Sequence, residues 1–412
     1  MQFPKFALSI GLALTLAACG TTPTPHSTQA DAGLAPLYAD GETIPGQYIV
    51  ALKDGSLVSG GVSAQTTASL LGALGLSSAD AQVRHVYSAA FQGFAAQLKG
   101  EALEKLRRDA RVAYIEQDQV MRVVPQGEGG IGTQATQSNA TWGLDRIDQR
   151  NMPLNGTYVY NRTGSGVTAY VVDTGIRTTH TQFGGRARAG YTAINDGRGS
   201  SDCNGHGTHV AGTVGGSTHG VAKSVSLVAV RVLDCNGSGA TSGIIAGLDW
   251  IRTNRRGASV ANMSLGGGAS SSLDTATNNL WNSGVTVVVA AGNENQNACN
   301  VSPARASGVI TVASSTSSDA RSSFSNYGSC VELFAPGSSI TSTWHTSDTA
   351  TNTISGTSMA SPHVAGAAAL YLSGNTGASP STVRSTIINQ STANVLSGVN
   401  GSPNRLLYTP GL

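Results

Sequence analysis

One stretch of the chain presents a serine at the start of an apolar, alanine-rich run, Gly356–Gly366. Gly356 permits a turn, and Thr357 offers an oxygen that could cap a helix beginning there. Ser358 is then expected in the first helical turn, where unpaired N–H groups and the positive end of the helix dipole favour an oxyanion. Pro362 is compatible with that turn, because its missing N–H is not needed there. A serine held at the end of a buried helix suits a nucleophile if an acid and a base complete the site.

An acid and a base that could complete such a site stand earlier in the chain. Asp173 ends an apolar run of valines, and His206 is flanked by glycines that let backbone and substrate approach it closely. Taken singly, the aspartate could cap a turn and the histidine could be an ordinary loop residue. Together with Ser358 they follow the order Asp, His, Ser that is found in subtilisin. The three residues therefore indicate a serine nucleophile, a histidine base and a carboxylate that orients the histidine.

The elements that must position these residues are strands and helices in alternation. Such an alternation is typical of an α/β fold in which a parallel sheet is flanked by helices on both faces. Functional groups in such folds gather at the carboxyl edge of the sheet. The strands are expected at 167–172, 227–232, 260–265, 285–290 and 309–312, and the helices at 206–215, 242–253, 272–283 and 358–372.

A smaller domain is expected at 45–124, before this framework. The order of its elements is β-α-β-β-α-β, which is that of a split βαβ domain. The stretch 125–134, with its proline and glycines, is expected to be an exposed linker of the kind that proteases cut. The α/β domain then occupies 135–412. In the smaller domain the strands are expected at 47–52, 83–87, 93–98 and 112–116, and the helices at 64–76 and 101–109.

The first residues carry an export signal. Lys5 precedes the apolar run Phe6–Ala18, which is too short to span a membrane and fits a secretory signal peptide at 1–19. The end of this run also resembles a bacterial lipobox, in which Cys19 would become a lipid anchor; a plain signal peptide with an incidental cysteine is the alternative. Residues 20–44 are rich in Thr, Pro, Ala and Gly and are expected to form a flexible tether.

Composition favours an exported globular protein without a nucleic-acid surface. Charged residues make up 12% of the chain and the formal net charge is +2, so no basic face is indicated. Apart from Cys19, four cysteines remain, an even number that suits an oxidising compartment and allows three pairings. None of them stands in a CxxC motif, which disfavours a zinc site.

The sequence resembles the subtilisin-like serine peptidases, and within them the proteinase K group, with most similarity to aqualysin-type bacterial members. The resemblance covers the chain from about Ala135 to the C-terminus, and the unit at 45–124 resembles the family's inhibitory, fold-assisting propeptide. It implies a secreted serine endopeptidase made as a zymogen and cut near Gln134–Ala135. The segments that carry it are 173–175 (DTG), 205–209 (GHGTH), 264–268 (SLGGG), 290–293 (AAGN) and 356–360 (GTSMA).

The resemblance also implies how a substrate would be held. Asn293 would donate its amide to the oxyanion beside the backbone N–H of Ser358. Two wall segments would pair with an extended peptide as an added strand, and a pocket without a charge at its base would favour apolar and aromatic P1 residues. Glu294 could stand at the pocket mouth and accept a basic P1, or be a solvated surface carboxylate. The walls would be Gly237, Ser238, Gly239, Ser264, Leu265 and Gly266, and the pocket Ala291 and Gly292.

The same resemblance implies two disulfide bonds and bound calcium. Two calcium sites are implied, and at each the alternative is a carboxylate that merely caps a surface turn. At the second site Glu332 stands where the family usually has the shorter Asp. The implied disulfides are Cys203–Cys235 and Cys299–Cys330. The ligands would be Asp145, Asp148, Gln149 and Asn155 at the first site, and Glu332 with the carbonyl oxygens of Ser307 and Val309 at the second.

The sequence therefore predicts a monomeric protease that acts on proteins and peptides, uses no organic cofactor and is inhibited by its own propeptide. A catalytically silent relative that serves as a binding or surface protein is the first alternative, and the intact set Asp173, His206, Ser358 and Asn293 argues against it. An esterase or lipase is the second. It would need a Gly-x-Ser-x-Gly elbow, which the sequence around Ser358 does not provide.

Overall fold

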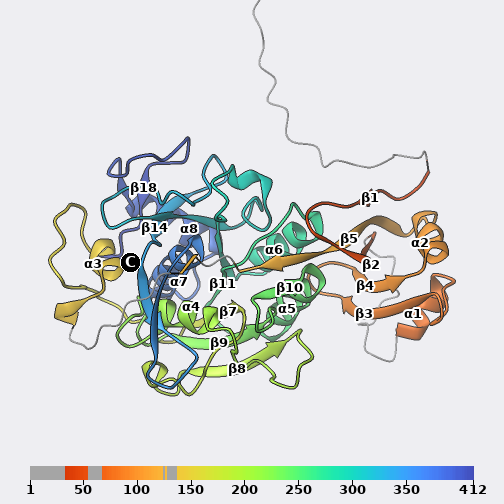
Figure 1. Cartoon of the computed structure of the whole chain (residues 1–412), viewed down its shortest axis with the longest axis horizontal. Helices are drawn as coiled ribbons and strands as arrows, with labels where there is room; N and C mark the ends of the chain where they lie inside the picture. The colour runs from red at the N-terminus through yellow and green to blue at the C-terminus, as the bar shows by residue number, and fades with distance from the viewer. Residues whose placement is uncertain (1–32, 54–66, 124–125, 128–136) are drawn as a thin grey trace, which may run out of the picture.

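A nine-stranded sheet forms the centre of the computed structural model, which describes residues 33–53, 67–123, 126–127 and 137–412 (Figure 1). All neighbouring strands are parallel except the first pair, which is antiparallel. The predicted α/β fold with a parallel sheet is confirmed. The strands lie in the order β17 (Thr392–Ala393), β18 (Arg405–Leu406), β14 (Leu333–Pro336), β13 (Ile310–Ser315), β12 (Thr286–Ala290), β11 (Ser259–Met263), β7 (Thr168–Asp173), β9 (Ser226–Arg231) and β8 (Ala187–Thr192).

Helices cover both faces of this sheet. On one face α4 (His206–Gly215) packs against α7 (Thr357–Gly374), and on the other α5 (Thr241–Asn254) packs against α6 (Ser271–Asn282). The helix α7 is buried on all sides along most of its length, as its apolar sequence predicts. A Cβ on Gly366 would lie only 2.6 Å from Val221 Cβ, so the close packing of α7 requires small residues. The remaining helical segments are α3 (Trp142–Ile147), α8 (Pro380–Gln390), η2 (Gln137–Asn139), η3 (Thr181–Phe183) and η4 (Ala298–Asn300).

The smaller unit has its own sheet and core. Its topology is the predicted split βαβ arrangement, extended by one short parallel strand at the edge. A separate cluster of buried apolar side chains fills the space between the sheet and its helices. The strand order is β1 (Leu37–Tyr38), β5 (Val112–Arg122), β2 (Thr43–Leu52), β4 (Gly93–Leu98) and β3 (Ala81–Tyr87), and the helices are α1 (Thr67–Ala73) and α2 (Gly100–Arg107).

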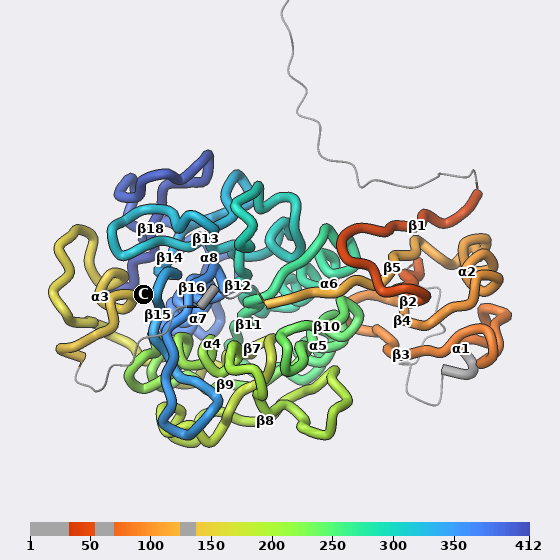
Figure 2. Tube along the Cα trace, in the orientation of Figure 1, coloured from red at the N-terminus to blue at the C-terminus, as the bar shows by residue number. Residues whose placement is uncertain are grey.

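The end of β5 leaves the small unit and runs into the large one (Figure 2). There it pairs with β10 (Ser238–Ala240) of the large unit, antiparallel. Tyr87 and Met121 of the small unit are fully buried, and they belong to the same apolar cluster as the core of the large unit. The two units therefore share an interface that is packed like a protein interior.

Several elements differ from those expected. Residues 37–38 and 43–44, predicted as part of a flexible tether, belong to β1 and β2; Leu37 packs on the small unit's core and Tyr38 on Tyr114. Strands β8, β14, β17 and β18 were not predicted, because they are short or carry no apolar period. The same holds for the Thr- and Ser-rich hairpin of β15 (Ile340–Thr343) and β16 (Thr351–Ser355).

Some predictions fall on residues outside the described ranges. These are the signal peptide, Cys19, the tether up to residue 32, the start of the helix at 64–76 and the bond Gln134–Ala135. Within the predicted linker only β6 (Gln126–Gly127) is described, and it pairs antiparallel with β16. Across the described part of the chain, no helix combines the length and the apolar character that crossing a bilayer would need.

Candidate active site

The fold brings Asp173, His206 and Ser358 to one edge of the large sheet. Asp173 is the last residue of β7, His206 is the first residue of α4, and Ser358 is the second residue of α7. All three are almost completely buried, with exposed fractions of 0%, 1% and 2%. The edge is the carboxyl edge of the parallel strands, as expected for a functional site in an α/β fold.

Asp173 and His206 are joined by a short hydrogen bond. His206 Nδ1 lies 2.8 Å from Asp173 Oδ1, and the backbone N–H of Thr174 donates to the same oxygen at 2.7 Å. A neutral imidazole that donates from Nδ1 has an unprotonated Nε2. His206 Nε2 is buried and has no hydrogen-bond partner among the described residues. The histidine is therefore arranged to accept a proton at Nε2.

The Ser358 hydroxyl points to the neighbouring wall in this structure. Its Oγ donates to the carbonyl oxygen of Ser264 at 3.2 Å. This bond is longer than the usual range for hydroxyl donors and is therefore weak. Rotation about the Cα–Cβ bond of Ser358 releases the hydroxyl for an acceptor on the histidine side.

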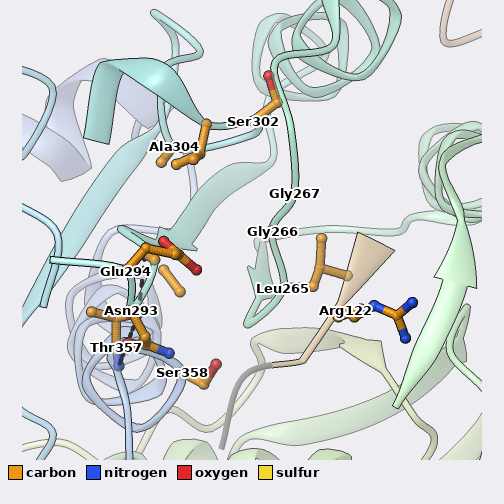
Figure 3. Close-up of a pocket in the computed structure, with 13 residues that line it drawn as sticks. Arg122, Leu265, Gly266, Gly267, Asn293, Glu294, Ser302, Ala304, Thr357 and Ser358 are labelled. Atoms are coloured by element: carbon orange, nitrogen blue, oxygen red, sulfur yellow. Dashed lines mark hydrogen bonds between the residues drawn. The ribbon is translucent and has the colours of Figure 1, made fainter. Parts of the chain in front are cut away.

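Asn293 is fixed by the residue that precedes the serine. Its Oδ1 accepts hydrogen bonds from the backbone N–H and the Oγ1 of Thr357, both at 2.8 Å. Because the oxygen end of the amide is held in this way, the Nδ2 end is turned away from Thr357, and the side chain lies beside Ser358 at the pocket (Figure 3). The sequence suggested that Thr357 caps α7, but in the structure it does not. Gly356 is the N-cap residue and makes no side-chain cap, whereas the Thr357 hydroxyl holds Asn293 and accepts from Gly292 N.

Pro362 lies deeper in α7 than expected. It is the sixth residue of the helix, not part of its first turn, so it lacks an N–H that would have bonded to the carbonyl of Ser358. Ser264 replaces that donor, because its Oγ donates to Ser358 O at 2.8 Å. Asn262 Nδ2 in turn donates to Ser264 Oγ at 2.9 Å. Because Pro362 leaves the carbonyl of Ser358 without a helical donor, Ser264 can link the backbone of the nucleophile to the end of β11.

A pocket opens beside Ser358 and Asn293 (Figure 3). Gly292, predicted for the pocket, lines it together with Leu265 from the predicted peptide wall, whereas Ala291 does not. Ala291 is fully buried behind the pocket in an apolar cluster, since side chains alternate in direction after β12. Glu294 lines the pocket as well, and its carboxylate accepts from Asn326 Nδ2 at 2.8 Å. Glu294 is exposed to solvent, so it is a surface carboxylate at the pocket whose orientation is set by Asn326. The pocket residues that sequence reasoning missed are Gly267, Ala290, Val301, Ser302, Ala304 and Thr357.

The end of β5 lies between the two predicted peptide walls. On one side Arg122, Met121 and Val120 pair with β10, and Val123 N donates to Gly237 O at 2.9 Å. On the other side Arg122 and Gly266 exchange two backbone hydrogen bonds of 3.2 and 3.3 Å. This part of the chain is thus an added strand in the cleft. Residues 124 and 125 separate it from β6, which pairs with the strand that leads to the serine.

Comparison with known proteins decides the family. Residues 164–406 match the Subtilase family and residues 47–123 match the family Peptidase inhibitor I9. The chain belongs to the subtilase family. It is 54% identical to the extracellular serine proteinase of Thermus sp. (strain Rt41A) over 98% of both chains. It is 55% identical to the alkaline serine exoprotease A of Vibrio alginolyticus over 80% of this chain and 60% of that one.

A solved structure agrees with this assignment. The crystal structure of a cold-adapted subtilisin-like serine proteinase is 58% identical and covers 66% of this chain and 99% of its own, with a TM-score of 0.65. This subtilase is accordingly a serine endopeptidase with an inhibitor-type propeptide, and the predicted alternatives of a silent binding protein and of an esterase are set aside.

Of the two calcium sites that the resemblance implied, the first fits a cation in part. Asp145 and Asp148 are buried near each other, and Asp148 Oδ1 has no hydrogen-bond partner among the described residues. Burial, with the nearby charge of Asp145, raises the pKa of Asp148 to about 6. A cation would satisfy the orphan oxygen and offset the repulsion between the two carboxylates. Asn155 Oδ1 already accepts from the backbone N–H and the hydroxyl of Thr157, whereas Gln149 donates from Nε2 to Pro153 O, a bond that does not involve its potential ligand atom Oε1.

The second calcium site does not fit, and that prediction is wrong. The guanidinium of Arg384 forms a salt bridge with Glu332 and also donates to the carbonyl of Ser307 at 3.4 Å. The other oxygen of Glu332 accepts from Thr311 N at 2.6 Å. The positively charged guanidinium of Arg384 thus occupies two of the three predicted calcium ligands, Glu332 and the carbonyl oxygen of Ser307. The longer Glu332 reaches Arg384 across the gap between β14 and α8.

Both disulfides implied by the resemblance are present. Cys203 pairs with Cys235 and Cys299 with Cys330, at Cα–Cα distances of 4.9 and 5.4 Å. Asp196 lies close to the first pair. Its carboxylate is held by the buried guanidinium of Arg231. Disulfide sulfurs carry no thiolate charge, so this group is not a metal site.

The propeptide places two carboxylates on helix ends of the enzyme. Asp118 accepts from the backbone N–H and the hydroxyl of Ser242, at the start of α5. Glu116 accepts from Ser270 Oγ and from Ser272 N, at the start of α6. Both carboxylates are 1% exposed. They satisfy N–H groups that helix ends leave unpaired, in the positive field of the helix dipoles.

Burial raises the pKa of both carboxyls, although their hydrogen bonds oppose this shift. Their pKa values in the complex therefore lie above those in the released propeptide. The protonated form of each carboxyl is thus favoured in the complex, and its protonation stabilises the complex. This stabilisation is complete below the ordinary pKa values, near 4, and is lost as the pH rises through the raised values.

We therefore predict that the processed propeptide leaves the enzyme faster at pH 8 than at pH 5. Aliquots of the processed complex would be held at each pH and diluted into one common assay buffer, and the appearance of activity would be followed. The variant Glu116→Gln, Asp118→Asn serves as the control and should show much less pH dependence. Equal release rates at the two pH values in the wild type would contradict the prediction.

Proposed function

We propose that this subtilase is a secreted, monomeric endopeptidase that is made as a zymogen and cuts its own linker. The observation that carries the proposal is the 2.8 Å hydrogen bond between Asp173 and His206 beside Ser358 at the N-terminus of α7. Secretion is supported by the signal-like stretch at 1–19 and by the Thermus relative, which is named an extracellular proteinase.

In the proposed reaction Ser358 Oγ attacks the carbonyl carbon of a peptide bond. His206 Nε2 takes the hydroxyl proton and later gives it to the leaving amine, while Asp173 stabilises the imidazolium that forms between the two steps. The developing oxyanion would be held by Asn293 Nδ2 and by the backbone N–H of Ser358, which lies in a helical turn that offers no intrahelical acceptor. In subtilisin itself, loss of the side-chain donor lowers kcat by about 10²–10³.

Substrates would bind as the end of β5 does. Residues Val120–Val123 are held by backbone hydrogen bonds to Gly237 and Gly266 and by pairing with β10, and such bonds do not depend on side-chain identity. Specificity would then arise mainly in the pocket. Leu265, Val301 and Ala304 give it apolar walls, which supports a broad preference for apolar and aromatic P1 residues. The Glu294 carboxylate adds tolerance for a basic P1.

A structural calcium ion is proposed at Asp145 and Asp148 only. Bound there, it would supply positive charge to two buried carboxylates and tie α3 to the turn that follows it. It would take no part in the bond cleavage, because these carboxylates lie outside the pocket and the cleft. Glu332 would contribute stability through Arg384 whether or not calcium is present.

The P1 preference is tested with a library of peptides that vary at P1. We expect the highest kcat/KM for Phe, Leu, Tyr and Ala, with measurable cleavage after Arg and Lys. The variant Glu294→Gln should lower cleavage after Arg and Lys and leave cleavage after Phe unchanged, which separates the carboxylate's effect from that of the apolar walls. A strict requirement for Asp, Glu or Pro at P1 would show that the pocket has been assigned to the wrong residues.

Maturation is tested with Ser358→Ala in a host that lacks other proteases. A tethered linker has a high effective concentration at the active site, so the enzyme's first substrate should be its own chain. The variant should accumulate as one uncut chain of propeptide and catalytic domain. Wild type should be cut between the two units, with a final cut near Gln134–Ala135. If Ser358→Ala is cut at the same bond at the wild-type rate, another enzyme does the processing.

Calcium is tested by thermal unfolding of the mature enzyme after inhibition, which prevents autolysis. Binding to the native state alone raises the unfolding temperature by mass action. Asp145→Asn together with Asp148→Asn should remove most of the rise. Glu332→Gln is the matched control: it should lower the unfolding temperature by the same amount with calcium and with a chelator. A calcium response that persists in the double variant and disappears in Glu332→Gln would reverse the assignment.

A further inference from the structure

A second carboxylate, Asp202, stands between the two loops that carry Asp173 and His206. It is half-buried in the segment before α4, four residues ahead of His206. It has no place in the reaction proposed above, and no periodic or motif signal in the sequence marks it. Its carboxylate nevertheless accepts five hydrogen bonds, more than its roughly four lone-pair sites can each take singly.

The two oxygens of Asp202 hold different parts of the site. Oδ1 accepts from Thr174 Oγ1, Asn204 N and Gly205 N, each at 2.9 Å. Oδ2 accepts from Thr208 N at 2.9 Å and from Thr208 Oγ1 at 2.6 Å. The bonded residues lie on both sides of His206 in the chain. Thr174, in addition, directly follows Asp173.

The first turn of α4 depends on this arrangement. The first N–H groups of a helix have no intrahelical partner and need acceptors from elsewhere. Here His206 N donates to Asn204 Oδ1 at 3.2 Å, Gly207 N donates to Thr174 Oγ1 at 2.9 Å and Thr208 N donates to Asp202 Oδ2. The N-cap residue, Gly205, has no side chain that could do this. The carboxylate charge also interacts favourably with the positive end of the helix.

We propose that Asp202 is a positioning residue for His206. It joins the start of α4 to the end of β7 through Thr174, and so fixes the imidazole against Asp173 at hydrogen-bonding distance. This inference rests on the proposed roles of Asp173, His206 and Ser358. All five hydrogen bonds of Asp202 go to the two loops that carry the acid and the base, and none goes to the peptide walls at 237–239 and 264–266.

The expected consequence is a loss of kcat with little change in KM. A misplacement of a catalytic group by about 1 Å can cost 10²-fold in rate, whereas substrate binding is set by the walls. Asp202→Asn keeps an acceptor for the three Oδ1 bonds and loses both bonds to Thr208, because an amide nitrogen cannot accept. Asp202→Ala loses all five. We expect kcat to fall about tenfold in the first and about 10²-fold in the second, with KM within about twofold of wild type.

The experiment measures kcat and KM of the mature variants on a chromogenic peptide with Phe at P1, together with the rate at which a sulfonyl fluoride inactivates each one. Inactivation needs the activated serine and no bound peptide, so its rate should fall in parallel with kcat. Asp234→Ala is the contrasting variant, because Asp234 Oδ1 accepts from Asn236 N and Ser238 N and so orders a peptide wall. It should raise KM and leave the inactivation rate unchanged.

Two outcomes would overturn the proposal: an unchanged kcat in Asp202→Ala, or a rise in KM at constant kcat. If Asp202→Ala does not fold, Asp202→Asn and Thr174→Val carry the test, since each removes only part of the network. Ser358→Ala, cut in trans by added wild-type enzyme and purified away from it and from the propeptide, distinguishes failure of the positioning role from failure of the proposed function. If it keeps wild-type activity, the proposed function fails; if it is inactive while the Asp202 and Thr174 variants keep kcat, only the positioning role fails.

Discussion

Asp173 Oδ1 and His206 Nδ1 are 2.8 Å apart and shielded from water, with the two side chains 0% and 1% exposed. In so dry a place a charged hydrogen bond is strong when it is made and an unpaired charge is costly. The pair therefore constrains the chain around it. The end of β7 and the first turn of α4 must lie close enough for this one hydrogen bond to form. The loop before α4 is held in place by the disulfide Cys203–Cys235 and by the hydrogen bonds of Asp202.

Asn293 and Ser358 are positioned in a similar way to each other. In both cases a side chain forms a hydrogen bond with a backbone group that α7 leaves unpaired. Asn293 accepts from Thr357 N and is oriented by doing so. Ser264 donates to Ser358 O, which has no helical partner because Pro362 has no N–H. The same hydrogen bonds therefore satisfy the first turn of α7 and position the catalytic groups. The propeptide binds the starts of α5 and α6 through two buried carboxylates, so it uses on the enzyme the same kind of contact that orders the active site.

The sequence predicts most of the large sheet and the residues of the site because both have local signals. Apolar runs of the right length predict buried strands, and a serine before an alanine-rich run predicts the start of α7. The misses are residues whose roles depend on tertiary partners. Glu332 reads as a calcium ligand until Arg384, 52 residues later, is found against it. Ala291 turns into the core, and Asp202 is a polar loop residue whose five donors come together only in the folded chain. No local pattern contains that information.

The central claim is that Ser358 is the nucleophile activated by His206. The most direct measurement is covalent labelling of the mature enzyme with a serine-directed sulfonyl fluoride, followed by peptide mapping in a mass spectrometer. The account predicts one adduct per enzyme molecule, located on Ser358, with labelling that proceeds in step with loss of activity and that is abolished in His206→Ala, after this variant has been cut in trans and freed of its propeptide. Complete loss of activity with the adduct on another residue, or full labelling of Ser358 in the His206→Ala variant at the wild-type rate, would contradict it.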